Sequence, residues 1–141
     1  MKHRNSKGLT LIEMMVVITL LGILVAMFAN YALNAAAGAR IKATKAGLET
    51  TRKLLEIYKL YENRYPEKLD VLRQPSPNNW NKSYVEKRSE LQDAWKHDYV
   101  YEVPGPDGKA YNLTSLGDDG KRGGTGENAD ISVWDEEEPA R

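Results

Sequence analysis

The sequence predicts an α+β fold, in which the second half of one long N-terminal helix packs against a small antiparallel β-sheet. Three observations lead to this prediction. No charged residue occurs between Met14 and Ala39, hydrophobic residues recur with helical spacing over 41–61, and alternating aromatic segments flank a Pro-Gly turn at 104–108. The chain has 141 residues, and the apolar run takes up roughly 25 of them, so the remaining residues suffice for one small globular domain.

The apolar run is long enough to cross a membrane, since about 20 such residues span the hydrocarbon core. Lys2, Arg4 and Lys7 precede it, and Glu13 lies at its start. A secretory signal peptide cleaved near 35–39 is one interpretation, and a short leader removed ahead of a retained run is the other. The run exceeds the 7–15 apolar residues of a signal peptide. A carboxylate in hydrocarbon is also costly unless it has a function, so both points favour a retained run.

The helix should extend beyond the apolar run to about Arg64 with an amphipathic pattern. Its apolar stripe consists of Leu48, Thr51, Leu55 and Tyr58, widened by Ile41, Leu54, Ile57 and Tyr61. Pro66 disfavours helical backbone at Tyr65, so we expect the helix to end there.

The rest of the chain predicts loops followed by a sheet. Residues 67–92 read as loop and short helix, and 98–103 and 111–115 form a hairpin around the turn at 104–108. A short third strand fits 131–134. The expected core contains Leu48, Leu55, Tyr58, Tyr99, Tyr101, Leu113 and Trp134.

Charge and composition exclude several classes of function. Residues 1–97 carry sixteen Lys and Arg against nine Asp and Glu, whereas 98–141 carry four against eleven. This acidic half argues against nucleic acid as a partner. The absence of cysteine excludes disulfides and thiolate metal sites. His3 and His97 are isolated in the sequence, and no nucleophile–base pair is recognisable, so we do not expect an enzyme.

A glycine-rich and acidic loop at 115–130 is a candidate metal site. Five of its sixteen residues are glycine, so ordering its backbone costs much conformational entropy. Ca²⁺ prefers six to eight hard oxygen ligands, both carboxylate and carbonyl. The available side-chain oxygens belong to Asp118, Asp119, Glu127, Asn128 and Asp130. The spacing is not that of an EF-hand, and a solvated acidic loop without an ion is the alternative.

Two stretches resemble the type IV pilin-like superfamily, and specifically the major pseudopilins of type II secretion systems. The first is the basic leader with Gly8, Leu9 and Glu13. The second extends from Tyr111 to Trp134 and includes Ser115-Leu116-Gly117, Asp119-Gly120, Gly123-Gly124 and Ala129-Asp130-Ile131. Pro66, Leu69 and residues 99–105 also fit, whereas 93–97 depart from the usual Asp-Pro-Trp-Gly turn of the family.

The resemblance implies that a prepilin peptidase cleaves after Gly8 and that the new N-terminus at Leu9 is methylated. It favours pairing of Glu13 with the free amine of a neighbouring chain during assembly; a carboxylate that reaches the lipid headgroups is the alternative. It further implies one bound Ca²⁺, with ligands from Leu116, Asp119, Thr125, Asn128 and Asp130.

The function implied is that of the major structural subunit of a type II secretion pseudopilus, a filament that drives folded proteins through the outer membrane. The domains would be a leader at 1–8, a transmembrane and filament-core helix at 9–39, and a periplasmic domain at 40–141. The chain would cross the bacterial inner membrane once. Expected partners are further copies in a helical filament, minor pseudopilins, the prepilin peptidase and an inner-membrane assembly platform with its ATPase.

Three alternatives remain: a type IV pilin for adhesion or motility, a minor pseudopilin at the filament tip, and a membrane-anchored periplasmic enzyme.

Overall fold

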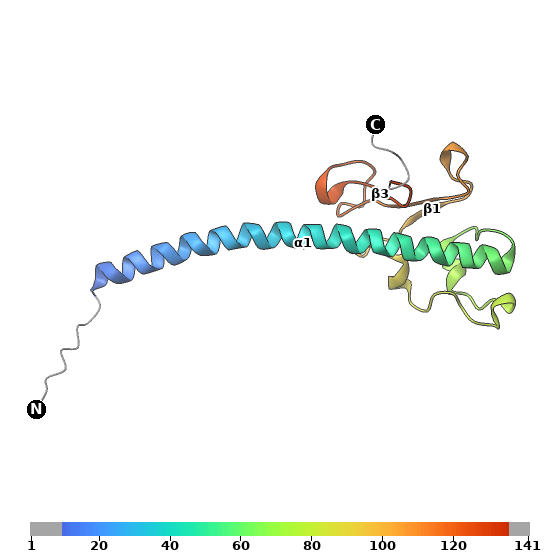
Figure 1. The fold of residues 1–141 in the computed structure, drawn as a ribbon, viewed down its shortest axis with the longest axis horizontal. Helices are drawn as coiled ribbons and strands as arrows, with labels where there is room; N and C mark the ends of the chain where they lie inside the picture. Colours follow the sequence, from blue (N-terminus) through green and yellow to red (C-terminus); the bar gives the residue numbers. More distant parts are fainter. Residues whose placement is uncertain (1–9, 136–141) are drawn as a thin grey trace, which may run out of the picture. The chain divides into compact units, whose positions relative to one another are not determined.

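A computed structural model describes residues 10–135 of the chain (Figure 1). These residues divide into two compact units, one ending at Ala36 and the other beginning at Ala37. We call the second the globular unit. The helix α1 (Leu11–Glu62) contributes to both units, and all strands belong to the globular unit.

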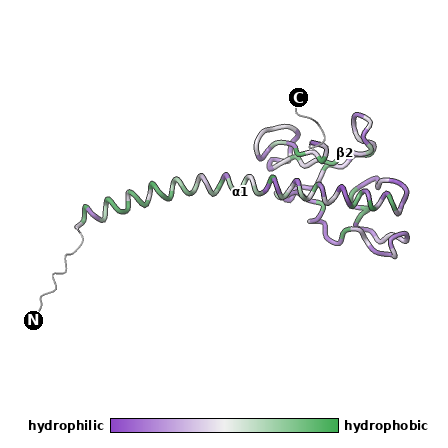
Figure 2. The backbone as a smooth tube through the Cα atoms, viewed as in Figure 1, coloured by the Kyte–Doolittle hydropathy of each residue, from purple (hydrophilic) through white to green (hydrophobic). Residues whose placement is uncertain are grey.

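The first part of α1 is apolar on every side, as Figure 2 shows by its green colour. An 18-residue window of α1 reaches a mean hydropathy of 2.6, and none of that window is buried within the chain. By length and composition this helix can therefore cross a membrane. The hydroxyl of Thr19 donates to the carbonyl oxygen of Met15 at 2.7 Å, which satisfies this polar group within the helix itself.

In the globular unit, one narrow stripe of α1 is buried. Its members are spaced by four and three residues, which places them on one face of the helix: Thr44, Leu48, Thr51, Leu55 and Tyr58. The predicted widening was wrong at two positions, because Ile57 and Tyr61 are exposed. Ile57 follows Leu55 by two residues, which is about 200° around a helix of 3.6 residues per turn, so it lies on the opposite face.

The helix ends at Glu62, slightly before the predicted position, and the residue that ends it is Asn63. Asn63 adopts a left-handed backbone conformation with φ of +57°, and its N–H donates to the carbonyl oxygen of Lys59 at 2.8 Å. Asparagine tolerates this conformation better than most residues and is a known helix terminator. Pro66 lies three residues after Asn63, so it is not the residue that ends the helix.

Residues between α1 and the sheet form three short 3₁₀ helices, η1 (Leu69–Arg73), η2 (Pro77–Asn79) and η3 (Arg88–Leu91). They agree with the expected mixture of loop and short helix. Figure 1 draws this segment on one side of the second half of α1 and the sheet on the other. Four apolar side chains of the segment are buried in the core, namely Leu69, Leu72, Val85 and Leu91.

The sheet has the order β1-β2-β3, with β1 at Val100–Glu102, β2 at Asn112–Ser115 and β3 at Ile131–Ser132. Both pairings are antiparallel, and Tyr101 lies opposite Leu113 in the predicted hairpin. A further 3₁₀ helix, η4 (Pro106–Gly108), forms part of the turn. The strands are shorter than predicted, but the hairpin and the third strand are confirmed.

Five of the seven predicted core residues are buried: Leu48, Leu55, Tyr58, Tyr99 and Leu113. Tyr101 and Trp134 are only partly buried and pack on the edge of the core. The centre of the aromatic cluster is a residue that the prediction omitted, Tyr111, which is fully buried. Its ring centroid lies 4.9 Å from that of Tyr65 and 5.3 Å from that of Trp134.

Candidate functional site

The start of α1 is capped by two residues of the N-terminal motif. The backbone N–H and the hydroxyl of Thr10 donate to Glu13 Oε2 at 2.7 and 2.9 Å, and the N–H of Glu13 donates back to Thr10 Oγ1 at 3.3 Å. This is a capping box, which satisfies N–H groups that a helix start would otherwise leave unpaired. Gly8 and Leu9 lie outside the described residues, so cleavage, methylation and the pairing of Glu13 with a neighbour's amine stay predictions.

The glycine-rich loop is closed on itself by backbone contacts. The N–H of Asp118 donates to the carbonyl oxygen of Glu127 at 2.9 Å, and a short 3₁₀ helix, η5 (Gly126–Asn128), closes the far side. A side chain at Gly117 (φ +67°) would place its Cβ only 2.4 Å from the oxygen of Glu127. A Cβ at Gly124 (φ +99°) would lie just as close, at 2.5 Å, to the carbonyl oxygen of Asn128. Glycine is therefore required at both points, by conformation and by space.

Two of the predicted ligands meet at one segment of this loop. Asp119 Oδ1 accepts the N–H of Lys121 at 3.0 Å, and Asp130 Oδ2 accepts the N–H of Gly123 at 3.0 Å. Because the two donors are only two residues apart, the carboxylates from the two ends of the loop are brought to the same short segment. Both side chains are exposed and accessible to an ion.

The remaining predicted ligands flank this segment. Leu116 directly follows β2, and Thr125 and Asn128 border η5, where the carbonyl oxygen of Thr125 accepts the N–H of Asn128 at 3.2 Å. Within residues 10–135, no three His, Cys, Asp or Glu side chains converge as a metal cluster. An ion in this loop would therefore have to combine two carboxylates with carbonyl, hydroxyl or amide oxygens.

The loop also contains a polar atom that its fold leaves unsatisfied. Glu127 Oε1 is buried and accepts no hydrogen bond. The Nη1 of its ion-pair partner Arg40 lies 3.8 Å from this oxygen. A buried carboxylate oxygen without a donor is costly. Together with the carboxylates of Asp119 and Asp130, this makes the loop a site of surplus negative charge built from hard oxygens. Such a donor set fits Ca²⁺, which binds oxygen ligands flexibly.

Sequence reasoning missed the residue that fixes the start of the loop, Asp93, whose side chain is fully buried. Its Oδ1 accepts the N–H groups of Trp95 and His97 at 3.0 and 2.9 Å. Its Oδ2 accepts the hydroxyl of Ser115 at 2.6 Å, and Ser115 Oγ in turn accepts the N–H of Gly117 at 3.2 Å. This chain of bonds ties the turn at 93–97 to the end of β2.

The turn at 93–97 forms although its sequence departs from the family pattern. Lys96 adopts a left-handed conformation with φ of +70°, at the position where the family pattern has glycine. His97 Nδ1 lies 2.9 Å from the carbonyl oxygen of Gly117 and so contacts the loop. His97 therefore has a hydrogen-bond partner in the folded chain.

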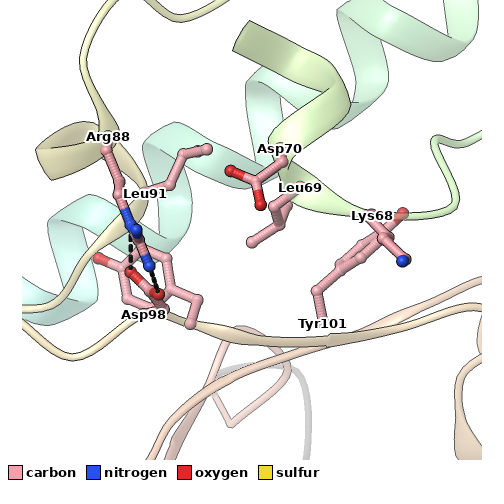
Figure 3. Close-up of a pocket in the computed structure, with 8 residues that line it drawn as sticks. Lys68, Leu69, Asp70, Arg88, Leu91, Asp98 and Tyr101 are labelled. Carbon is pink, nitrogen blue, oxygen red and sulfur yellow. Dashed lines mark hydrogen bonds and ion pairs between the residues drawn. The ribbon is translucent and has the colours of Figure 1, made fainter.

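A pocket of about 170 Å³ opens between η1, η3 and β1 (Figure 3). Its residues are Lys68, Leu69, Asp70, Arg88, Leu91, Asp98, Tyr99 and Tyr101. Arg88 Nε donates to Asp98 Oδ1 at 3.3 Å, and the amide of Gln92 donates to the same oxygen at 2.9 Å. These bonds, the one from Arg88 foremost, lower the pKa of Asp98, while burial raises the pKa of Tyr99 to about 12. Arg88 and Asp98 therefore neutralise each other within the pocket.

Comparison with known proteins agrees with this architecture. The family model described as "Type II secretion system (T2SS), protein G" matches residues 31–134, and the "Prokaryotic N-terminal methylation motif" matches residues 3–29. Type II secretion system core protein G of Pseudomonas aeruginosa is 36% identical over 143 residues, covering 96% of this chain and 99% of the relative. The protein of the same name from Vibrio cholerae is 34% identical over 140 residues, covering 94% of each.

A solved structure gives the same fold. The crystal structure of the major pseudopilin from the type 2 secretion system of enterohaemorrhagic Escherichia coli superposes with a TM-score of 0.57 at 27% identity. It covers 72% of this chain and 92% of that one. The apolar N-terminal helix and the methylation motif agree with membrane anchoring. The pilin-like fold and the resemblance seen in the sequence are thus confirmed, and the chain belongs to the type II secretion system protein G family, the major pseudopilins.

Proposed function

We propose that this chain is the major structural subunit of a type II secretion pseudopilus, polymerised to export folded proteins through the outer membrane. The observation that carries the proposal is the first half of α1, whose hydrophobic side chains have no partner within the described chain. Such a helix needs lipid around it, and in a filament it needs other copies of itself. A structural role, without catalysis, agrees with the names of the relatives.

The N-terminal steps of this proposal involve residues 1–13. A prepilin peptidase removes residues 1–8 after Gly8, and Leu9 becomes the methylated N-terminus. Glu13 then pairs with the amine of a neighbouring copy, which fixes the stagger between helices and neutralises two charges in hydrocarbon. Residues 9–39 cross the inner membrane once, with residues 40–141 in the periplasm. Minor pseudopilins and an assembly platform with its ATPase supply the remaining parts of the machine.

Substitution of Glu13 tests this function in a strain lacking its major pseudopilin. The unsubstituted chain should restore secretion and form filaments visible by electron microscopy, whereas Glu13→Ala should remain membrane-bound without polymerising. Glu49→Ala is a matched control, because Glu49 is an acidic residue of the same helix that lies in the globular unit. Filament formation by Glu13→Ala at the normal level would contradict the assigned role of this carboxylate.

We further propose that the loop at 115–130 holds one Ca²⁺. Asp119 and Asp130 would supply carboxylates, Leu116 a carbonyl, and Thr125 and Asn128 further oxygens. The ion would join the two ends of the loop and offset its surplus negative charge. It would thereby take the place of a disulfide, which this chain cannot form because it contains no cysteine.

Chelation of the ion provides the test. At a calcium concentration near 100 times its dissociation constant, binding stabilises the fold by about 2.7 kcal/mol, so a chelator should lower Tm by roughly 10 °C. Asp119→Ala should abolish the calcium-dependent shift of Tm. Asp118→Ala is the control, since it removes an adjacent exposed carboxylate without removing a proposed ligand. An unchanged Tm on chelation would refute the metal site.

A further inference from the structure

His97 is the residue whose side chain connects the turn at 93–97 to the glycine-rich loop. Its Nδ1 lies 2.9 Å from the carbonyl oxygen of Gly117. A carbonyl oxygen can only accept a hydrogen bond, so Nδ1 carries the hydrogen and donates it. The imidazole also packs on the loop further along, because a Cβ built on Gly120 would lie 3.6 to 3.8 Å from three of the ring atoms. One side chain thus contacts the loop on both sides of Asp119 in sequence.

The turn at 93–97 holds His97 in place. Asp93 Oδ1 accepts the N–H of His97 at 2.9 Å, and the N–H of Asp93 donates to the carbonyl oxygen of His97, also at 2.9 Å. The turn is bonded to α1 as well, since the hydroxyl of Thr44 accepts the N–H of Ala94 at 3.2 Å. The side chains of Asp93 and Thr44 are both buried. The imidazole therefore contacts the loop from a backbone that is itself anchored in the core.

The peptide group between Gly117 and Asp118 is held at both ends. Its carbonyl oxygen accepts the bond from His97, and its N–H donates to the carbonyl oxygen of Glu127 at 2.9 Å. The φ angle at 117 is +67°, and glycine adopts many other backbone conformations as readily as this one. Without the bond from His97, this peptide group would be restrained at its N–H alone. His97 therefore restrains the backbone that leads into Asp119.

The preceding peptide group carries another proposed ligand, the carbonyl oxygen of Leu116. The N–H of the same peptide belongs to Gly117 and donates to Ser115 Oγ at 3.2 Å. This peptide is trans, so its N–H and C=O point in opposite directions, and the bond to Ser115 also sets the direction of the Leu116 carbonyl. Both peptide groups meet at the Cα of Gly117. Movement of the one that His97 holds would therefore disturb the orientation of this carbonyl as well.

We propose that His97 is a positioning residue of the ion site, which holds residues 116–120 in the conformation that presents Leu116 and Asp119 to Ca²⁺. The proposal rests on the calcium site proposed above, and His97 is not itself a ligand in it. Ordering a flexible loop costs free energy, and binding to a loop that is already ordered avoids that cost. Loss of the bond from His97 should therefore weaken calcium binding and loosen the segment in the absence of calcium.

Two substitutions of nearly equal size and shape test whether the hydrogen bond is responsible. Asparagine carries its amide nitrogen on Cγ, as histidine carries Nδ1, so His97→Asn can still donate to Gly117, whereas His97→Leu cannot. Calcium binding to the full-length chain in detergent is measured by isothermal titration calorimetry. We expect His97→Leu to raise Kd about fivefold and His97→Asn to leave it within about twofold of the unsubstituted value.

Thr44→Val is the matched control, because it removes a bond to the same turn on the side of α1 and not on the side of the loop. It should lower Tm without changing Kd for calcium. A role of His97 in general stability alone would predict the opposite, namely that Thr44→Val and His97→Leu raise Kd in proportion to their loss of Tm.

Hydrogen exchange gives a measurement that does not involve the ion. With calcium chelated, residues 116–120 should exchange about fivefold faster in His97→Leu than in His97→Asn, because the bond that restrains them is lost. An unchanged Kd for His97→Leu, equal losses for His97→Asn and His97→Leu, or an equal rise for Thr44→Val would overturn the role of His97 while leaving the calcium site intact. Failure of the unsubstituted chain to bind calcium would overturn the site and this inference together.

Discussion

Asp93 provides the most demanding test of the structure, because one buried carboxylate accepts three hydrogen bonds from two separate segments. Asp93→Ala would leave two backbone N–H groups and the hydroxyl of Ser115 without their acceptor. Each bond to a charged group contributes about 1.5 to 3 kcal/mol, but the substitution also removes the cost of burying a charge. We therefore expect a net loss of about 3 kcal/mol in the free energy of unfolding.

For a globular unit of this size, such a loss lowers Tm by about 10 to 20 °C. The assay is thermal unfolding of the full-length chain in detergent, followed by near-ultraviolet circular dichroism of its Tyr and Trp side chains. Asp93→Asn keeps an acceptor for the two N–H groups of the turn and should lose only about 1 kcal/mol. Ser115→Ala, combined with Asp93→Ala in a double-mutant cycle, should show coupling of at least about 0.5 kcal/mol. A loss below about 1 kcal/mol for Asp93→Ala would refute the role assigned to this carboxylate.

Three further predictions test other parts of the fold. Gly117→Ala forces a Cβ to within 2.4 Å of a backbone oxygen and should cost more than about 2 kcal/mol, whereas Gly123→Ala, with open space around it, should cost only about 1 kcal/mol. Equal effects in chemical denaturation would argue against the close approach in the loop. The pKa of Asp98 is lower in the folded chain than in the unfolded one, so its contribution is complete above about pH 4 and is lost as pH falls through the folded pKa. Asp98→Asn should therefore reduce the acid sensitivity of unfolding, by at most about 1 kcal/mol because the pair is exposed, and an unchanged pH profile would contradict this. Leu55→Ala should lose about 2 to 5 kcal/mol from the core and Leu60→Ala less than about 0.5 kcal/mol on the surface, so a reversed order in urea titrations would show that the buried face is wrongly assigned.

The sequence was sufficient to predict the long helix, the hairpin and the third strand, because periodicity and turn residues are local signals. It was less reliable where burial depends on tertiary partners. Thr44 is polar and was not assigned to the buried stripe, but its hydroxyl accepts the N–H of Ala94 at 3.2 Å, which makes its burial tolerable. Tyr111 was omitted from the predicted core because its central position depends on ring contacts with Tyr65, Tyr101 and Trp134, which the sequence does not reveal.

The candidate sites divide in the same way. The glycines and acids at 115–130 are contiguous in sequence, so their concentration in one loop could be recognised directly. The network that positions the loop could not, because Asp93 and Ser115 are separated by 22 positions and meet only in the folded chain. The capping box at Thr10 and Glu13 did have a local signal, since a threonine followed three residues later by glutamate is the pattern of such a cap.

The capping box at Thr10 and Glu13 reduces the free energy that this glutamate can contribute to assembly. A lone subunit in the bilayer already provides its glutamate with two donors from its own chain. If Glu13 pairs with a neighbour's amine as proposed, joining a filament would exchange one set of polar contacts for another, so the net gain would be smaller than that for a carboxylate without any donor. In the filament proposed above, this smaller gain would make the incorporation of each subunit easier to reverse.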